Sequence, residues 1–328
     1  MTIGQVAELW RYPVKSLGGA RIEHADVGPR GVLGDRLWAV RDVEKGVTAS
    51  ARQLPALLTA TARYLDAVPP DAGPGNVPEV AITFPDGSVV PSSDSGVNTK
   101  LSELAHREVE LTALPPVDDT RLHELSRAER SETMSAGWLR AAFGLADDDK
   151  LPDLSMMRFS DMVNFTRYST PPGMFVDLAP LHVLTKTSLA TIGAEVGSDL
   201  DVRRFRPNVL LAVDDPADGL PESHWTGAQL AVGGTVLEVT MPTIRCVVPS
   251  RAQPGFEVDR RITKVVATRA ERCLGVYCWV DTGGRVRVGD DVALRPANAS
   301  RRFLGEAGRR AKRITFGLVN MGIDRLSR

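Results

Sequence analysis

Hydrophobic and polar residues alternate over short stretches in the first third of the chain. Between residues 5 and 42, runs such as "QVAELW" and "RLWAVRD" are separated by Gly and Pro, and residues 79–90 ("EVAITFPDGSVV") place Pro-Asp-Gly between two β-prone runs. Alternation with a period of two is typical of half-buried strands, and a Pro-Asp-Gly turn joins two of them into a hairpin. We therefore predict a β-barrel-like N-terminal module over residues 1–120.

The pattern changes to a helical spacing after residue 120. Residues 121–149 are rich in Ala, Glu and Arg and carry apolar residues three and four positions apart, which predicts a helical segment over residues 121–150 that bridges two modules. Residues 180–197 ("PLHVLTKTSLATIGAEVG") begin like a strand and continue like a helix. Thr185 or Thr187 is the expected N-cap of that helix, and Gly197 lies just past its end.

The rest of the chain is again of β type. Residues 207–214, 228–242 and 274–296 show strand patterns broken by glycine turns. This favours a barrel with a few helices over residues 151–296, rather than a parallel α/β sheet. The predicted fold class is mainly β (α+β), with an N-terminal β-barrel-like module followed by a second β-barrel.

Composition and charge argue against several classes of protein. The chain has 328 residues, of which 43% are hydrophobic and 25% charged, an ordinary globular composition. A formal net charge of -1 argues against nucleic-acid binding by the whole chain. We see no secretion signal and no apolar run long enough for a transmembrane segment. Three cysteines, Cys246, Cys273 and Cys278, leave one unpaired in any pairing, which favours a reducing, cytoplasmic setting.

A basic C-terminal tail is predicted over residues 297–328. From residue 300 onward it carries eight Arg or Lys against two acids, with apolar residues interleaved. One interpretation is an amphipathic segment that contacts an anionic membrane or an acidic electron-donor protein. The other is a solvated tail, or a terminal helix packed on the body of the protein.

Four short strings place charged or polar groups beside glycine, proline or a strand edge. They are "YPVKS" (Lys15, Ser16), "GDRLW" (Asp35, Arg36), "RFRPN" (Arg206, Asn208) and "TIRC" (Arg245, Cys246). Each fits a structural role when taken alone, and a lone cysteine is more often a small buried hydrophobe than a reactive thiol. Together their types are complementary, because Lys and Arg bind phosphate and a thiolate is a soft ligand for a transition metal.

The same strings carry a resemblance to a known family. "LWRYPVKSLGG", "GVLGDRLWAVRD" and "ARQLPAL" resemble the N-terminal β-barrel module found ahead of MOSC domains, and "FRPNVLLAV", "LAVGGTVLEVTMPTIRCVV" and "LGVYCWVDTGGRVRVGDDV" resemble the MOSC domain itself. The family includes the mitochondrial amidoxime-reducing component and its bacterial relatives. The resemblance implies binding of the molybdenum cofactor (Mo-molybdopterin) and molybdenum-dependent reduction of small N-hydroxylated substrates.

The resemblance also implies residue roles. Cys246 matches the family's molybdenum ligand, and Asp177 in "FVDLAPLHVLT" matches an acidic residue beside the cofactor, so these two are the candidate catalytic residues. The implied cofactor-binding residues are Lys15, Ser16, Arg36, Asp177, Arg206, Asn208, Ile244, Arg245 and Tyr277. The chain departs from the family just after Asp177, where Leu178 and Ala179 replace hydroxyl residues.

The electron source is expected to be a separate protein. Three cysteines, one of them matched to the metal, cannot supply a four-cysteine iron–sulfur cluster, and no dinucleotide-binding glycine fingerprint follows a strand. We therefore expect no iron–sulfur cluster and a ferredoxin- or reductase-like donor. Two alternatives stay open: a non-catalytic molybdenum-cofactor carrier or sulfur-transfer MOSC protein, and a MOSC-like scaffold that acts on another ligand without the metal.

Overall fold

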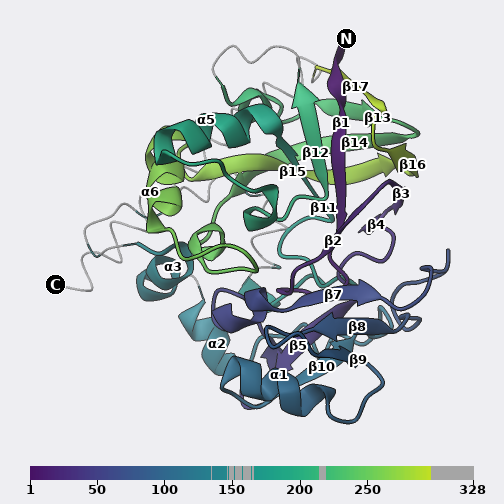
Figure 1. Ribbon diagram of the computed structural model, residues 1–328, viewed down its shortest axis with the longest axis vertical. Coiled ribbons are helices and arrows are strands. Elements are labelled where there is room, and N and C mark those ends of the chain that lie inside the picture. The colour runs from purple at the N-terminus through teal and green to yellow at the C-terminus, as the bar shows by residue number, and fades with distance from the viewer. Residues whose placement is uncertain are drawn as a thin grey trace.

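A closed barrel of seven strands forms one lobe of the molecule, drawn in the upper half of Figure 1. The computed structural model describes residues 1–133, 135–145, 166–213 and 219–296, together with the single residues 147, 151, 157 and 164. In sheet order the barrel strands are β12 (Val209–Val213), β11 (Leu181–Thr185), β15 (Cys273–Thr282), β14 (Thr235–Ile244), β13 (Gln229–Val232), β17 (Asp291–Arg295) and β1 (Thr2–Arg11). The short β2 (Ala20–Ile22) extends the sheet beside β1.

The first strand of the chain closes the barrel. β1 pairs antiparallel with β17 on one side and with β12 on the other. The β12 side is tight at Gly4, whose φ is 151° and where a Cβ atom would lie 1.9 Å from the carbonyl oxygen of Ala212. Only glycine fits there. The N-terminal residues therefore pair the edges that the remaining six strands would otherwise leave open.

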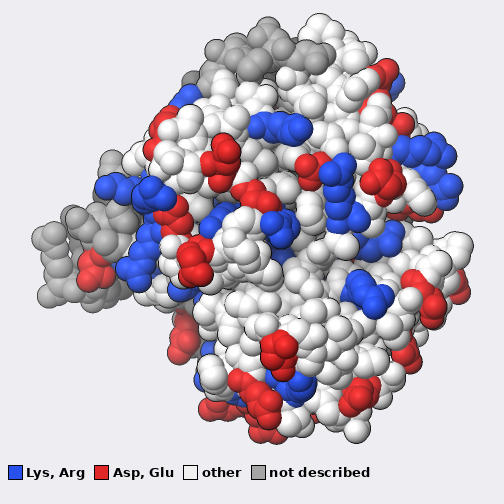
Figure 2. Space-filling view, viewed as in Figure 1, with Lys and Arg blue, Asp and Glu red and all other residues white. Residues whose placement is uncertain are grey.

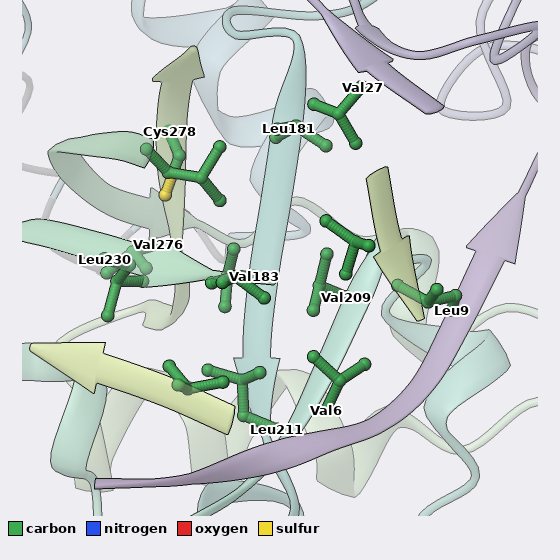
Figure 3. Close-up of a cluster of buried hydrophobic side chains, with 14 of the residues drawn as sticks. Val6, Leu9, Val27, Leu181, Val183, Val209, Leu211, Leu230, Val276 and Cys278 are labelled. Carbon is green, nitrogen blue, oxygen red and sulfur yellow. The ribbon is translucent and has the colours of Figure 1, made fainter. Parts of the chain in front are cut away.

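Apolar side chains fill the barrel. Along β14, buried and half-buried residues alternate over all ten positions, as expected when one face of a strand lines a core. Val183, Val209, Leu230 and Val276 point into this interior together with Cys278, which has no exposed surface (Figure 3). Each fully buried aliphatic side chain stabilises the fold by roughly 1.5–3 kcal/mol.

Two helices cover one side of the barrel. α5 (Lys186–Val196) connects the parallel strands β11 and β12, and it packs with α6 (Arg260–Arg269). The Thr185 hydroxyl accepts a hydrogen bond from the Ser188 amide at 3.1 Å, and Gly197 ends the helix in the left-handed conformation. The predicted strand–helix unit is therefore confirmed, with Thr185 as the N-cap.

The second lobe holds most of the N-terminal module (Figure 1, lower half). Its core contains Val40, Leu57, Ile82, Leu101 and Val109. The lobe is built from β5 (Trp38–Asp42), β6 (Val47–Thr48), η1 (Pro55–Thr59), β7 (Thr61–Tyr64), β8 (Val80–Thr83), β9 (Val89–Pro91), α1 (Val97–Ala105) and β10 (Val109–Ala113). The β8–β9 pair confirms the predicted hairpin.

A small sheet and short 3₁₀ turns complete the structure, and the sheet packs its side chains into the barrel core. A small sheet of β3 (His24–Gly28), β4 (Gly31–Val32) and β16 (Gly284–Arg287) links the two ends of the described chain. Short 3₁₀ turns, η2 (Val202–Arg204), η3 (Pro221–His224) and η4 (Val248–Ser250), lie between the barrel elements.

The predicted bridging segment contains two short helices. They are α2 (Arg127–Glu132), which begins with a capping box between Ser126 and Glu129, and α3 (Ala136–Phe143), which Ser135 caps. The segment between residue 121 and Ser126 is not helical, so the described part is less helical than predicted. With five α-helices in the described residues, the mainly β fold class is confirmed.

Acidic and basic side chains are interspersed over both lobes on the face shown in Figure 2, in line with the near-zero net charge. Among the residues described, no helix is both long enough and apolar enough to cross a membrane. The basic segment 297–328 lies outside the described residues.

Candidate functional site

A cavity of about 140 Å³ lies where the two lobes meet. Its walls contain all ten residues to which the family resemblance assigned a role at the cofactor: Lys15, Ser16, Arg36, Asp177, Arg206, Asn208, Ile244, Arg245, Cys246 and Tyr277. Asp35, in the same motif as Arg36, does not line the cavity. Lys15, Ser16 and Arg36 come from the N-terminal module, and the other seven from the loops and strands of the barrel lobe. The fold therefore brings together groups that are far apart in the sequence.

Two loops of the N-terminal module support each other at the cavity wall. The Lys15 amide donates to the carbonyl oxygen of Trp38 at 2.8 Å, and the Arg36 amide donates to that of Tyr12 at 2.7 Å. The Asp35 carboxylate accepts from the Tyr12 amide at 2.8 Å and forms an ion pair with the Arg36 guanidinium. These contacts fix the positions from which Lys15 and Arg36 reach into the cavity.

Backbone strain is concentrated at this site. Six non-glycine residues with positive φ occur in the described chain, and three of them are Ser16 (72°), Arg36 (51°) and Arg206 (57°). Such conformations cost of order 1–3 kcal/mol each and persist where surrounding contacts hold them. The Ser16 hydroxyl accepts from the Ala51 amide at 2.9 Å, and Arg206 Nη1 donates to the Leu17 carbonyl oxygen at 2.6 Å. Glycine at these three positions would relieve the strain. The strain is therefore a cost of placing the side chains of Ser16, Arg36 and Arg206 at the cavity wall.

The cavity has an excess of positive charge. Among the described residues, five cationic side chains line it, Lys15, Arg36, Arg52, Arg206 and Arg245, and one carboxylate, that of Asp177. Behind the wall, Asp35 pairs with Arg36. Lys15 forms an ion pair with Asp177. An anionic ligand would compensate the remaining charge.

The pKa values of the charged side chains reflect the crowding of cations at the cavity. Burial lowers the pKa of Lys15, although Asp177 opposes the shift. Burial and the neighbouring Arg36 lower the pKa of Arg206 to about 10. Burial alone would raise the pKa of Asp177, but Lys15, Arg52 and Arg36 outweigh it and hold that pKa below its ordinary range. The cations thus lower one another's pKa, and the two described carboxylates that pair with them, Asp177 and Asp35, do not balance five positive charges.

Two guanidinium nitrogens point to where such a ligand would bind. Arg206 Nη2 and Arg245 Nε are buried and have no hydrogen-bond partner among the described residues. A buried, unpaired donor is costly unless a ligand satisfies it. Phosphate oxygens and the carbonyl and ring nitrogen atoms of a pterin are suitable acceptors, so the donor set fits a molybdopterin-type cofactor.

His182 contacts the guanidinium of Arg245 at the cavity wall. The imidazole Nε2 lies 3.4 Å from Arg245 Nη1, and burial, followed by Arg245 and Arg36, lowers the pKa of His182 well below its ordinary value. The neutral ring can therefore accept from the guanidinium. Gly275 makes room for this ring, because at its φ of 82° a Cβ atom would lie 2.3 Å from His182 Nε2.

Asn208 has a structural contact on each side. Its side-chain nitrogen donates to the Trp10 carbonyl oxygen at 3.4 Å, and its side-chain oxygen accepts from the His182 amide at 3.3 Å. The residue is 1% exposed and lines the cavity. Asn208 thus holds β1 and β11 together at the cavity floor, a role that the sequence did not predict.

Cys246 lies at the cavity, half-buried, just after the end of β14. Cys278 is enclosed in the barrel core, where burial raises the pKa of its thiol. Cys273 pairs in register with Ile244 and does not line this cavity. Of the three thiols, Cys246 is therefore the one placed to bind a ligand there.

Arg52, His182 and Phe205 are among the cavity residues that sequence reasoning missed. Arg52 lies in the quoted motif "ARQLPAL", and its guanidinium carbon stacks 5.6 Å from the centre of the Trp138 ring. His182 lies in "PLHVLT", and the Phe205 ring packs 5.4 Å from the guanidinium of Arg245. Its place in a motif that carries the family resemblance was the available signal for Arg52, while the roles of His182 and Phe205 depend on tertiary packing.

Comparison with known proteins gives the same two-part organisation. Residues 3–95 match the family model of the MOSC N-terminal beta barrel domain, and residues 171–293 match that of the MOSC domain. The chain is 25% identical to mitochondrial amidoxime reducing component 2 of Homo sapiens over 313 residues, which cover 88% of this chain and 83% of the relative. The chain is 23% identical to mitochondrial amidoxime-reducing component 1 of Homo sapiens over 315 residues, which cover 89% of this chain and 83% of the relative.

A third relative, mitochondrial amidoxime reducing component 2 of Bos taurus, is 22% identical. The alignment covers 88% of this chain and 83% of the relative. The two domain models occur in the order that the structure shows, and the relatives align along most of both lobes. The chain therefore belongs to the MOSC-domain proteins, with a MOSC N-terminal β-barrel domain ahead of its MOSC domain.

Proposed function

We propose that this protein is a molybdenum-cofactor-binding oxidoreductase that reduces N-hydroxylated compounds with electrons from a separate, ferredoxin- or reductase-like donor protein. One observation carries the proposal. The ten residues that the family resemblance assigns to the cofactor line a single cavity, which is rich in cations and contains unpaired guanidinium donors. The relatives named above as amidoxime-reducing components support the reaction class.

The residues divide into an anion-binding group and a metal-binding end. Lys15, Arg36, Arg206 and Arg245 would hold the phosphate and pterin of the cofactor through charge-assisted hydrogen bonds. Cys246 would supply the protein's thiolate to molybdenum. Ser16, Ile244 and Tyr277 would shape the pocket around the pterin.

The cofactor supplies the redox chemistry of the reaction when it is bound. In the overall reaction the N–O bond of the substrate breaks, and two electrons and two protons convert the N-hydroxyl oxygen to water while the nitrogen is reduced. The carboxylate of Asp177 lines the cavity, and about half of its side chain is exposed. We assign it to positioning Lys15 and to hydrogen bonding near the N–O group. Leu178 and Ala179, which also line the cavity, add no hydroxyl there.

The proposal includes a cytoplasmic location. It rests on the three cysteines, of which Cys278 is buried as a small hydrophobe in the barrel. The relatives carry "mitochondrial" in their names. Fractionation of the source cells with an antibody to this chain would test the location.

The test of function combines metal analysis with turnover. Purified protein should contain molybdenum and pterin, and it should reduce benzamidoxime with an artificial one-electron donor. A carrier or sulfur-transfer protein would contain the cofactor without turnover. A scaffold that acts on another ligand would contain no molybdenum, which would overturn the proposal.

A further inference from the structure

A second cavity, of about 490 Å³, adjoins the first. Lys15, Ser50 and Arg52 line both cavities, so these three side chains stand where the two meet. The volume lies within the range of small-molecule binding sites, roughly 300–1,000 Å³. None of the sequence-predicted site residues other than Lys15 lines the second cavity.

Helix α3 forms the wall between the cavities. Leu139 and Phe143, one turn apart, line the first cavity, while Trp138, Ala141 and Ala142 line the second. Residues four positions apart share one face of a helix, and the adjacent positions face elsewhere. A change at Ala141, which is exposed, therefore alters the second cavity and leaves the face toward Cys246 intact.

The lining of the second cavity combines charged and aromatic groups. At the shared edge, the ammonium of Lys15 and the guanidinium of Arg52 present positive charge, and both hold the pKa of Asp177 below its ordinary range against the effect of burial. The rest of the wall includes Tyr168, Val47 and Leu125, together with Trp138, whose ring centre lies 5.6 Å from the Arg52 guanidinium carbon. Its other charged side chains are Lys45, Glu129 and Glu132.

Resting on the proposed function, we infer that the second cavity binds the body of a planar aromatic N-hydroxylated substrate. The oxygen of an N–O group carries partial negative charge, so Lys15 and Arg52 attract it to the shared edge, which leads toward Cys246. The aromatic body packs among the apolar and aromatic groups of the wall. Arg52 is thus a substrate-positioning residue, and α3 determines how large a substrate the protein accepts.

The test fills the second cavity from α3. Ala141→Trp places a large side chain in it, and Ala190→Trp, at an exposed position of α5 that lines neither cavity, is the matched control. Two substrates are compared in the molybdenum-loaded protein: benzamidoxime, which has an aromatic body, and hydroxylamine, which has none. Ala141→Trp should raise KM for benzamidoxime at least tenfold and leave KM for hydroxylamine and the molybdenum content unchanged. Ala190→Trp should match the wild type throughout.

A second readout is independent of turnover. Isothermal titration calorimetry should show benzamidoxime binding to the wild type and to Ala190→Trp, with at least tenfold weaker binding to Ala141→Trp. Tyr168→Ala, which enlarges the cavity instead of filling it, should also weaken binding and serves if Ala141→Trp fails to fold. Unchanged KM and affinity in both cavity variants would overturn the inference. No turnover of either substrate by the molybdenum-loaded wild type would instead overturn the proposed function, and the calorimetry would still decide whether the cavity binds the aromatic compound.

Discussion

The ammonium of Lys15 and the carboxylate of Asp177 form an ion pair although 162 positions separate them in the sequence. Lys15 follows β1, and Asp177 lies in the loop that leads to β11, so the pair ties the two lobes together at the cavity. The Lys15 side chain is 7% exposed and that of Asp177 48%. The lysine is the desolvated partner and depends on the carboxylate for compensation.

Asp177→Asn should lower the free energy of unfolding at pH 7 by about 1 kcal/mol, a small value because the carboxylate is half exposed. The cations hold the folded-state pKa of Asp177 below the ordinary 3.8. A lowered carboxyl pKa gives stability that is present above the ordinary pKa and is lost as the pH falls toward the folded-state value. Urea unfolding at pH 7 and pH 3 should therefore show a difference between variant and wild type that shrinks at the lower pH. A difference independent of pH would contradict this account.

Cys246→Ser should leave the fold intact and abolish turnover, because a hydroxyl is a much poorer ligand than a thiolate for the metal. Cys278→Ser is the matched control: it places a hydroxyl in the barrel core and should cost roughly 1–3 kcal/mol of stability without removing the cofactor. Thermal unfolding and molybdenum analysis separate the two effects. Full activity of Cys246→Ser would end its assignment as the metal ligand.

Arg206→Ala should lower cofactor occupancy. It removes a charge-assisted contact worth roughly 1.5–3 kcal/mol, or about 10- to 150-fold in affinity. Arg203→Ala is the control, since Arg203 pairs with Asp201 and lines neither of the two cavities. The measurement is molybdenum and pterin per chain after identical purification. Equal occupancy in the two variants would place the phosphate elsewhere.

Local patterns in the sequence were enough to predict the strand–helix unit at Thr185 and Gly197, because caps and periodicity are encoded within a few residues. They were also enough for the β8–β9 hairpin. They could not show that β1 closes the barrel, because its pairing with β12 links residues about 200 positions apart and depends on the close approach at Gly4.

The candidate site, like the fold, was only partly predictable from the sequence. Motif resemblance supplied the ten residues, but their convergence on one cavity depends on the packing of two lobes. The strained backbone of Ser16, Arg36 and Arg206 leaves no local signal, since none of them is glycine. The neutral state of His182 likewise arises from burial next to Arg245, which only the fold creates.

Glu222 should make stability depend on pH in the opposite sense to Asp177. This carboxyl is 2% exposed, accepts from the hydroxyls of Thr185 and Ser188 at 2.7 Å, and has its pKa raised by burial. A raised folded-state pKa gives stability that is present below the unfolded-state pKa and is lost as the pH rises through the folded-state value. Glu222→Gln removes this titration, so its unfolding free energy relative to wild type should increase from pH 4 to pH 8. A flat difference would show that Glu222 is uncharged or fully compensated across that range.

The last prediction concerns the electron supply. If a separate protein is the donor, the purified chain should not oxidise NADH in the presence of an N-hydroxylated substrate until a ferredoxin- or reductase-like partner is added. A small-molecule reductant should drive turnover without the partner. Removing residues 297–328, which carry the basic tail, should slow the partner-driven reaction more than the reaction with the small reductant, because opposite charges raise the encounter rate between proteins. It should also weaken the salt dependence of the partner-driven reaction. An equal fall in both reactions would mean that the tail serves the fold instead of docking a donor, and turnover with NADH alone would mean that the chain itself holds the missing redox centre.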